Sequence, residues 1–372
     1  MRKKSINRMM AVCAAAFLFA MTGCGASKEE KQQLSSAFKQ LEQAQYEEAL
    51  EKFEKLKKAE DLKMDVYRGI GIAQFELRDY DAAVKALKTA LSSSDGYVGE
   101  KEIDIAMYLA DAYGKNQMAD KALEVYDDII GVDKDYEAAY LKKGELLLDS
   151  QNTEDAVKTF DKLINLHKKE ASMYIRIYEL MEEKGFGEEG KKYLEDGQIY
   201  CGSDADGKYM LGQISYYQGN EQDALKYLDQ AAKDGKDDAY TFLGRIYEEA
   251  GEYDTAASFY SKYLDKHADS DSTYSKLSVC MLKQEKYEVA LDYIQKGLTN
   301  GSGEAKQELL YHEAVVYEYL LDFTTAKQKF EEYMALYPSD EQAAKELDFL
   351  MTQAGTAQEE QPSESENVQE GE

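Results

Sequence analysis

The sequence is poor in the residues that interrupt helices and in those that bind nucleic acid. It has two prolines and no tryptophan among 372 residues. Because proline breaks helix interiors, its near absence, together with the lack of any alternating β pattern, predicts an all-α fold. Acidic residues outnumber basic ones, and the formal net charge is −28. A polyanion repels phosphate backbones, so we expect no nucleic-acid partner.

Cysteine and histidine are also scarce, with four and three copies. No H-E-x-x-H pair and no zinc-type cysteine spacing occurs. His167 and His267 stand at matching places near the ends of expected helices, where capping or solvent exposure is the simplest role. Abundant glutamates in so acidic a chain carry no catalytic signal. We therefore expect no metal, no cofactor and no catalytic residue, and interpret the chain as a non-enzyme.

The chain does contain a small-residue anchor that returns at intervals of 32 to 39 residues. The anchors are Ala49, Ala83, Ala122, Ala156, Gly190, Ala224, Ala256, Ala290 and Ala326. Four positions after each stands a large residue: Phe53, Leu87, Tyr126, Phe160, Leu194, Leu228, Tyr260, Ile294 and Phe330. Similar groups precede the anchors, as in Tyr240, Leu243 and Gly244. Spacings of three, four and seven mark one helix face, so each unit is predicted to be two amphipathic helices.

These residues resemble the signature of the tetratricopeptide repeat family over roughly residues 30–340. The resemblance implies a right-handed α-solenoid of about nine helix-turn-helix repeats, whose first helices line a concave groove. The terminal proline of the signature survives only as Pro338, and the first and fifth units match least well. The array is expected to occupy residues 30–354, with a closing helix at 341–354 that covers the last repeat. Residues 355–372 are acidic and expected to be disordered.

The first 23 residues have the form of a targeting segment. A basic start (Arg2, Lys3, Lys4, Arg8) precedes the apolar run Met9–Ala20, which is too short for a stable membrane span. Met21-Thr22-Gly23-Cys24 then resembles a bacterial lipobox, in which a lipid is attached to the cysteine. Residues 24–29 are the lipidated Cys24 and a short linker. An ordinary secretory signal or an uncleaved anchor are the alternatives, and both still export the array.

This segment places the protein on the outer face of a bacterial cytoplasmic membrane, held by its lipid. The chain has 39 lysines and 6 arginines, a bias that favours a Gram-positive source. In a Gram-negative cell the protein would face the periplasm.

The positions that line the groove in this family correspond to a set of expected partner-binding residues in this sequence. They are Arg176, Tyr209, Gln213, Tyr216, Tyr217, Phe242, Arg245, Tyr311 and Tyr319. Tyrosines at helical spacing are more often packing than recognition. Tyr216 and Tyr217 are harder to dismiss, because adjacent helix residues cannot both point into one seam. Rigid aromatics beside charges are typical of binding hot spots.

The leading interpretation is a membrane-anchored, extracytoplasmic scaffold that binds a protein or peptide in its groove. Because groove carboxylates are abundant, the partner is expected to be basic or rich in aromatic residues, and to act in cell-envelope assembly or secretion. The alternative is a cell-surface glycan-binding lipoprotein that uses the groove tyrosines. A hydrolase and a plain spacer are weaker readings.

Overall fold

The computed structural model describes residues 26–359, except 95, 97, 300, 302 and 339; of residues 304 and 353–359 it describes the backbone only. The targeting segment 1–23, the lipid-attachment residue Cys24 and residues 360–372 lie outside this part of the chain. Among the residues described, no helix combines the length and the apolar character needed to cross a bilayer.

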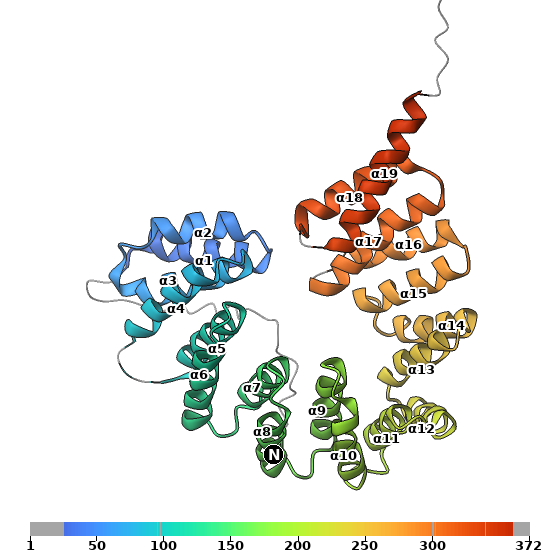
Figure 1. Cartoon of the computed structure of the whole chain (residues 1–372), viewed down its shortest axis with the longest axis horizontal. Helices are drawn as coiled ribbons and strands as arrows, with labels where there is room; N and C mark the ends of the chain where they lie inside the picture. Colours follow the sequence, from blue (N-terminus) through green and yellow to red (C-terminus); the bar gives the residue numbers. More distant parts are fainter. Residues whose placement is uncertain are drawn as a thin grey trace, which may run out of the picture. The chain divides into compact units, whose positions relative to one another are not determined.

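The described chain consists of helices and contains no strand. It divides into two compact units, the first ending at Gly197 and the second beginning at Gln198. A short 3-10 helix (Glu60–Leu62) precedes α3. The α-helices, labelled in Figure 1, are α1 (Lys28–Glu42), α2 (Tyr46–Lys55), α3 (Lys63–Glu76), α4 (Tyr80–Ser92), α5 (Glu100–Lys115), α6 (Ala119–Val132), α7 (Glu137–Asp149), α8 (Thr153–Leu166), α9 (Ala171–Glu183), α10 (Gly187–Gln198), α11 (Ala205–Tyr217), α12 (Glu221–Lys233), α13 (Asp238–Glu249), α14 (Tyr253–Leu264), α15 (Asp271–Lys283), α16 (Tyr287–Leu298), α17 (Gly303–Tyr319), α18 (Phe323–Leu336) and α19 (Glu341–Glu359).

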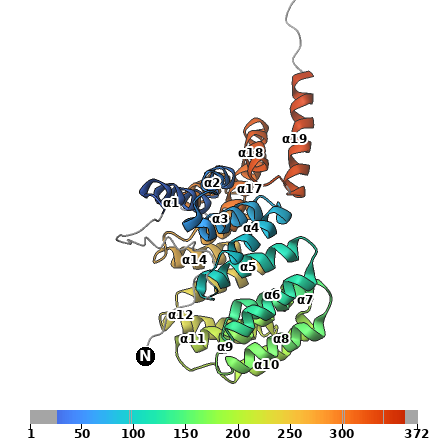
Figure 2. The same cartoon turned by 90° about the vertical axis from the view of Figure 1, so that its left-hand side faces the viewer.

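The first eighteen helices form nine consecutive pairs, and α19 packs beside α18 at the end of the second unit (Figure 2). The predicted number of repeats and the closing helix are thus confirmed. The closing helix runs to Glu359, beyond the expected end at residue 354. Gly355 directly after the expected end weakens a helix without breaking it, Ala357, Gln358 and Glu359 favour helix, and the next proline is Pro362, so α19 continues past the expected place.

In the second, fourth, sixth and seventh pairs a glycine of the first helix meets a large residue of the second. Every alanine anchor is completely buried, and so are most of the large residues four positions later. In the fourth pair, a β-carbon added to Gly144 of α7 would lie 2.1 Å from Cε1 of Phe160 on α8. In the seventh, one added to Gly244 of α13 would lie 2.5 Å from Cε1 of Tyr260 on α14. Glycine is needed at these two positions because the ring of the second helix rests directly on the backbone of the first.

The turn inside every pair contains one residue with positive φ, five positions before the anchor. The φ angles lie between +57° and +81°, at Ala44, Arg78, Gln117, Gln151, Gly185, Gly219, Gly251, Glu285 and Leu321. In the fourth pair Gln151 N–H donates to Leu148 O (2.8 Å) and Asn152 N–H donates to Leu147 O (2.8 Å), a Schellman ending. Six of the nine residues are not glycine, so this regularity is hidden in the sequence.

The fifth pair reverses the size pattern, which explains its weak match. Tyr178 of α9 stands where the other pairs have glycine, alanine or serine, and the anchor on α10 is Gly190. A β-carbon on Gly190 would lie 3.2 Å from Cδ2 of Tyr178, and one on Gly197 would lie 2.7 Å from Cβ of Tyr174. Large residues on the first helix are thus accommodated by small ones on the second.

Candidate functional site

Four of the expected binding residues meet on two neighbouring first helices of the second unit. Tyr209, Tyr216 and Tyr217 of α11 surround Phe242 of α13, with ring centroids 6.3, 5.2 and 6.1 Å from that of Phe242. All three contacts are edge-to-face, the geometry that aromatic pairs prefer. We call these four residues the aromatic cluster. Tyr209 and Tyr216 share a helix face because they are seven residues apart.

The aromatic cluster is more deeply packed than the sequence suggested. Phe242 is only 8% exposed, and the three tyrosines are half-buried. Tyr216 and Tyr217 stand next to each other on α11, and neither is fully buried or fully exposed. Both rings contact Phe242 of the next first helix edge-to-face, and they also contact each other, with centroids 5.2 Å apart.

Arg245 covers one side of this cluster. Its guanidinium carbon lies 5.2 Å from the ring centroid of Tyr216 and 5.6 Å from that of Phe242, which are cation–π distances. Its Nε donates to Glu249 Oε1 at 2.9 Å, and the Tyr216 hydroxyl donates to the other oxygen of Glu249. Burial and the Glu249 carboxylate raise the pKa of Tyr216 to about 12, so the hydroxyl remains a neutral donor. These contacts hold Arg245 and Tyr216 in fixed positions.

Two other expected residues take separate places. Gln213 lies half-buried on α11, one turn from Tyr209 and Tyr217, at the edge of the cluster. Arg176 belongs to the first unit, on α9, where its Nη1 lies 3.8 Å from Glu137 Oε2. It is not part of the aromatic cluster.

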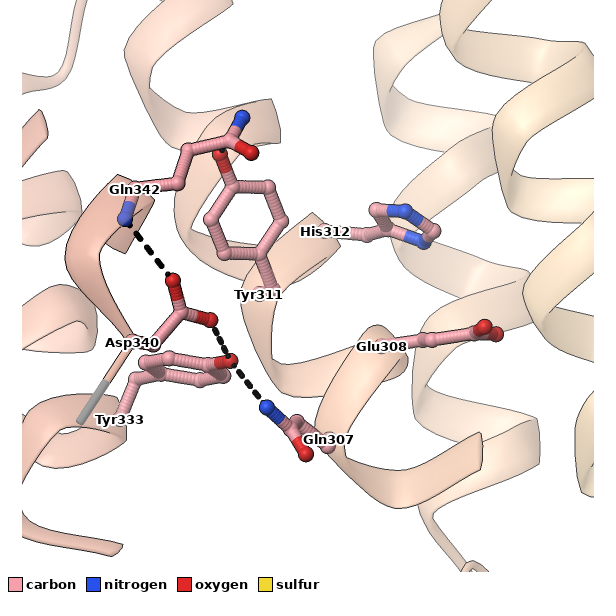
Figure 3. Close-up of a pocket in the computed structure, with 7 residues that line it drawn as sticks. All are labelled: Gln307, Glu308, Tyr311, His312, Tyr333, Asp340 and Gln342. Carbon is pink, nitrogen blue, oxygen red and sulfur yellow. Dashed lines mark hydrogen bonds between the residues drawn. The ribbon is translucent and has the colours of Figure 1, made fainter. Parts of the chain in front are cut away.

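Tyr311 of α17 lines a polar pocket of about 240 Å³ near the end of the second unit (Figure 3). Gln342 Nε2 donates to the Tyr311 hydroxyl, and Gln307 Nε2 donates to the Tyr333 hydroxyl, both at 2.9 Å. The Tyr333 hydroxyl in turn donates to Asp340 Oδ2. The pocket is lined by Gln307, Glu308, Tyr311, His312, Tyr333, Asp340 and Gln342.

Glu308 and His312, which line another side of this pocket, contact serines of α15. The Ser275 hydroxyl donates to Glu308 Oε2 at 2.7 Å, and Ser278 Oγ lies 3.2 Å from His312 Nδ1. Burial lowers the pKa of His312, so its imidazole is neutral at pH 7. Sequence reasoning missed Asp340 and Gln342, because they join the pocket only through the connection to α19. The one sequence signal for this part of the pocket was Asp340, a carboxylate that stands directly before the predicted closing helix.

Tyr319 lies apart from this pocket. It is the last residue of α17 and is 58% exposed. Its ring stacks on that of Tyr287, the first residue of α16, with centroids 5.4 Å apart and an interplanar angle of 6°. The exposed Tyr319 and the half-buried Tyr287 thus stack where α17 ends and α16 begins.

The two cysteines among the described residues, Cys201 and Cys280, are free thiols. Burial raises the pKa of Cys201 to about 11 and that of Cys280 to about 12, with nearby Glu248 adding to the effect on Cys280. A thiol must ionise to act as a nucleophile, so neither cysteine is activated for catalysis.

Comparison with known proteins agrees with the repeat structure. The family model described as tetratricopeptide repeat matches residues 40–98, 109–171 and 209–272, together half of the chain. No curated protein matches the sequence.

Similar solved structures include the APC/C hetero-tetramer Cut9–Hcn1, with 12% identity, a TM-score of 0.44, and coverage of 88% of this chain and 78% of that one. A tetratricopeptide repeat protein of Parabacteroides merdae has 13% identity and a TM-score of 0.36, covering 87% of this chain and 100% of that one. PilF of Pseudomonas aeruginosa has 17% identity and a TM-score of 0.39, covering 56% and 95%.

Proteins built from such repeats are generally non-enzymatic scaffolds that bind proteins or peptides. On the matched segments and the nine helix pairs, the chain belongs to the tetratricopeptide repeat family.

Proposed function

We propose that this protein is a lipid-anchored, extracytoplasmic scaffold whose aromatic cluster binds a protein or peptide partner during cell-envelope assembly or secretion. The observation that carries the proposal is the fixed group of Tyr216, Tyr217 and Arg245 on the first helices α11 and α13. Tyrosine and arginine dominate binding hot spots, and side chains already held in place lose little entropy when a partner arrives.

The charges around the cluster indicate the kind of partner. Glu249 is half-exposed at its rim, and it accepts hydrogen bonds from both Arg245 and Tyr216. The whole chain is strongly acidic, with a net charge of −28. A basic segment that also carries an aromatic residue fits this surface, because its charge is complementary and its ring can pack on the tyrosine edges.

The membrane attachment in this proposal rests on the Met21–Cys24 motif and on the start of the fold. The first helix begins at Lys28, with Ser27 and Glu30 forming a capping box, so only a few residues separate it from Cys24. A lipid on Cys24 would hold the array near the outer surface of the cytoplasmic membrane, or on the periplasmic side in a Gram-negative cell. Acyl chains contribute about 0.8 kcal/mol per buried methylene, so two or more anchor stably.

The anchor is tested by replacing Cys24 with serine and feeding cells an alkyne-tagged palmitate analogue. We expect the wild-type protein to take up the label and to partition into detergent, and C24S to do neither. Equal labelling of both forms would show that the lipid is attached elsewhere or not at all.

Partner binding is tested by placing a photo-crosslinking amino acid at Tyr217 in living cells. The matched control is Tyr227, a half-buried tyrosine on α12, the second helix of the same pair. We expect one crosslinked protein, identified by mass spectrometry, from position 217 and none from 227. The double variant Tyr216→Ala, Tyr217→Ala should lose this partner while its helical circular dichroism stays intact. Crosslinking from both positions alike, or full capture by the double variant, would contradict the proposal.

Glycan binding is the second candidate, favoured only by the polar pocket at Tyr311, whose tyrosines and amides could hydrogen-bond a sugar. The aromatic cluster itself is a poor sugar platform, because its rings meet edge-to-face and Arg245 covers a face of Tyr216. Calorimetric titration with cell-wall polysaccharides distinguishes the two: binding that is lost in Tyr311→Ala and kept in Tyr217→Ala would favour the glycan.

A further inference from the structure

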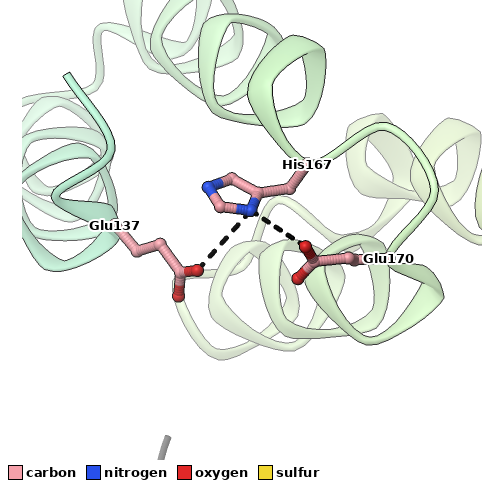
Figure 4. A group of neighbouring side chains, drawn as sticks. All are labelled: Glu137, His167 and Glu170. Carbon is pink, nitrogen blue, oxygen red and sulfur yellow. Dashed lines mark hydrogen bonds and ion pairs between the residues drawn. The ribbon is translucent and has the colours of Figure 1, made fainter. Parts of the chain in front are cut away.

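Three side chains from two segments, the start of α7 and the turn between α8 and α9, meet in the first unit (Figure 4). Glu137 is the first residue of α7, His167 follows the last residue of α8, and Glu170 precedes the first residue of α9. His167 Nδ1 lies 3.6 Å from Glu137 Oε1 and 3.3 Å from Glu170 Oε1. One oxygen of each glutamate and this nitrogen all lie within 4.8 Å of one another.

The two separations from His167 match the edges of a tetrahedral metal site. Zinc binds imidazole nitrogen and carboxylate oxygen at about 2.0–2.2 Å, which places neighbouring ligand atoms about 3.4 Å apart. Both distances from His167 Nδ1 are close to this value. The remaining edge, between the two carboxylates, can close by rotation of Glu170, whose side chain is 54% exposed.

The other two side chains are held in place. Glu137 and His167 are each only 15% exposed. Arg176 lies 3.8 Å from Glu137 Oε2 and thereby orients the carboxylate while leaving Oε1 directed at His167. Metal-binding carboxylates are commonly supported by such an outer partner. The open side at Glu170 leaves room for water as a fourth ligand.

The same turn follows the seventh pair, but there it lacks the second carboxylate. Glu170 N–H donates to His167 O at 2.9 Å, and Ser270 N–H donates to His267 O at 3.0 Å. His267 Nε2 lies 3.4 Å from Asp237 Oδ2, but Lys266 occupies the other oxygen of Asp237 at 2.6 Å. The turn therefore forms with serine in place of Glu170, so the backbone does not need a glutamate there.

We propose that Glu137, His167 and Glu170 form a binding site for a divalent transition-metal ion, with Zn²⁺ as the best fit. One imidazole and two carboxylates suit zinc, cobalt or manganese, whereas calcium and magnesium prefer sites built from oxygen alone. Sequence motifs did not show the site, because Glu137 stands far from His167 and Glu170 in the sequence. The inference is independent of the proposed partner binding.

The test is calorimetric titration of the full-length chain, purified in detergent, with ZnCl₂ in metal-free buffer. We expect one site per chain, and at least a tenfold loss of affinity in His167→Gln and in Glu170→Ser, in line with the about 10–100-fold effects seen when metal sites lose a supporting group. His267→Gln is the matched control and should bind zinc like the wild type.

A second readout separates a site from loose attachment to surface carboxylates. Four-coordinate Co²⁺ absorbs visible light strongly. We expect this absorption from the wild type and not from His167→Gln. Glu170→Ser should keep the wild-type melting temperature without metal, since the same turn exists with serine. Absence of a one-to-one site in the wild type, or unchanged zinc affinity in both site variants, would overturn the proposal.

Discussion

The fourth and seventh helix pairs, α7–α8 and α13–α14, are two versions of one structure, and their equivalent residues have the same spacing along the sequence. Their anchors are Ala156 and Ala256, both completely buried. Each has a glycine on the first helix beneath a ring on the second, and a histidine in the turn that follows. Yet the surfaces of their first helices have little in common.

The surface of α7 is ionic, whereas that of α13 is aromatic. On α7, Lys142 lies 3.0 Å from Glu145, while Lys184 lies 3.1 Å from Glu145 and 2.9 Å from Asp149. The corresponding positions on α13 hold Phe242, Arg245 and Glu249, the centre and rim of the cluster described above. The interior of a pair is fixed by helix packing, and its surface is free to change, so the proposed function depends on residues that the repeat does not constrain.

The largest effect is expected from filling the glycine contacts. Gly144→Ala and Gly244→Ala should each destabilise the protein by about 2 kcal/mol, because the new methyl group collides with a buried ring. The control is Gly131→Ala on α6, where an added β-carbon meets nothing within 4 Å. That change should stabilise the helix by up to about 1 kcal/mol. Urea unfolding and amide exchange of the affected helices measure the difference, and equal shifts for all three variants would contradict it.

The next effect concerns the rings themselves. The Tyr260 hydroxyl donates to Glu248 Oε2 at 2.6 Å, whereas the fourth pair has Phe160 and a fully buried Leu148 at these positions. Phe160→Tyr should destabilise by about 1–3 kcal/mol, because it buries a hydroxyl without a partner. Adding Leu148→Glu should restore part of the loss by supplying the acceptor found in the seventh pair. If the double variant is no more stable than Phe160→Tyr, the two pairs are less alike than their packing indicates.

A smaller effect is expected in the turns. Gln151 has φ of 59° and Gly251 has φ of 75°. Gln151→Gly should stabilise the fourth pair and Gly251→Gln should destabilise the seventh, each by about 1 kcal/mol, because only glycine adopts this conformation without strain. Thermal unfolding of both variants gives the sign. Stabilisation by both changes, or by neither, would show that side-chain contacts outweigh backbone strain there.

The smallest effect is a pH dependence specific to the ionic surface. Burial opposes ionisation of Glu145, but hydrogen bonds from Lys142 and Lys184 outweigh it and hold the pKa of Glu145 below 4.5. A carboxyl whose pKa is lower in the folded state stabilises the fold at any pH above its pKa in the unfolded chain. This stabilisation is lost as the pH falls through the pKa of the folded state. Glu145→Gln should therefore be less stable than the wild type at pH 7, by at most about 1 kcal/mol, and similar to it in acid. A gap in unfolding free energy that does not narrow towards acid would contradict this.

Much of the fold could be predicted because packing imposes a strict spacing. The anchors and the residues four positions later must be small and large in every pair, so the sequence revealed the nine pairs and the closing helix. The turn residues escaped notice because a left-handed conformation is tolerated by several residue types at a modest cost. Arg78 and Leu321 give no sequence sign of their positive φ.

The candidate sites were harder to predict because they depend on contacts between elements. Phe242 was expected to line a groove, but its position on α13 also faces α11, where three tyrosines enclose it. Glu137 and His167 are thirty positions apart, and neither residue alone suggests a ligand. Arg176 was grouped with residues that lie in the second unit, but in the structure it pairs with Glu137 of α7.

The contact between a ring and a glycine closes within a single pair, as between Gly144 and Phe160 or Gly244 and Tyr260. Each such pair therefore carries its own glycine–ring contact, while its outer faces pack on the neighbouring pairs, as Phe242 does on the tyrosines of α11. Duplication or loss of whole pairs would lengthen or shorten such an array with readjustment only where neighbouring pairs meet, and a lineage could acquire new recognition surfaces by copying before it altered the glycine–ring contact.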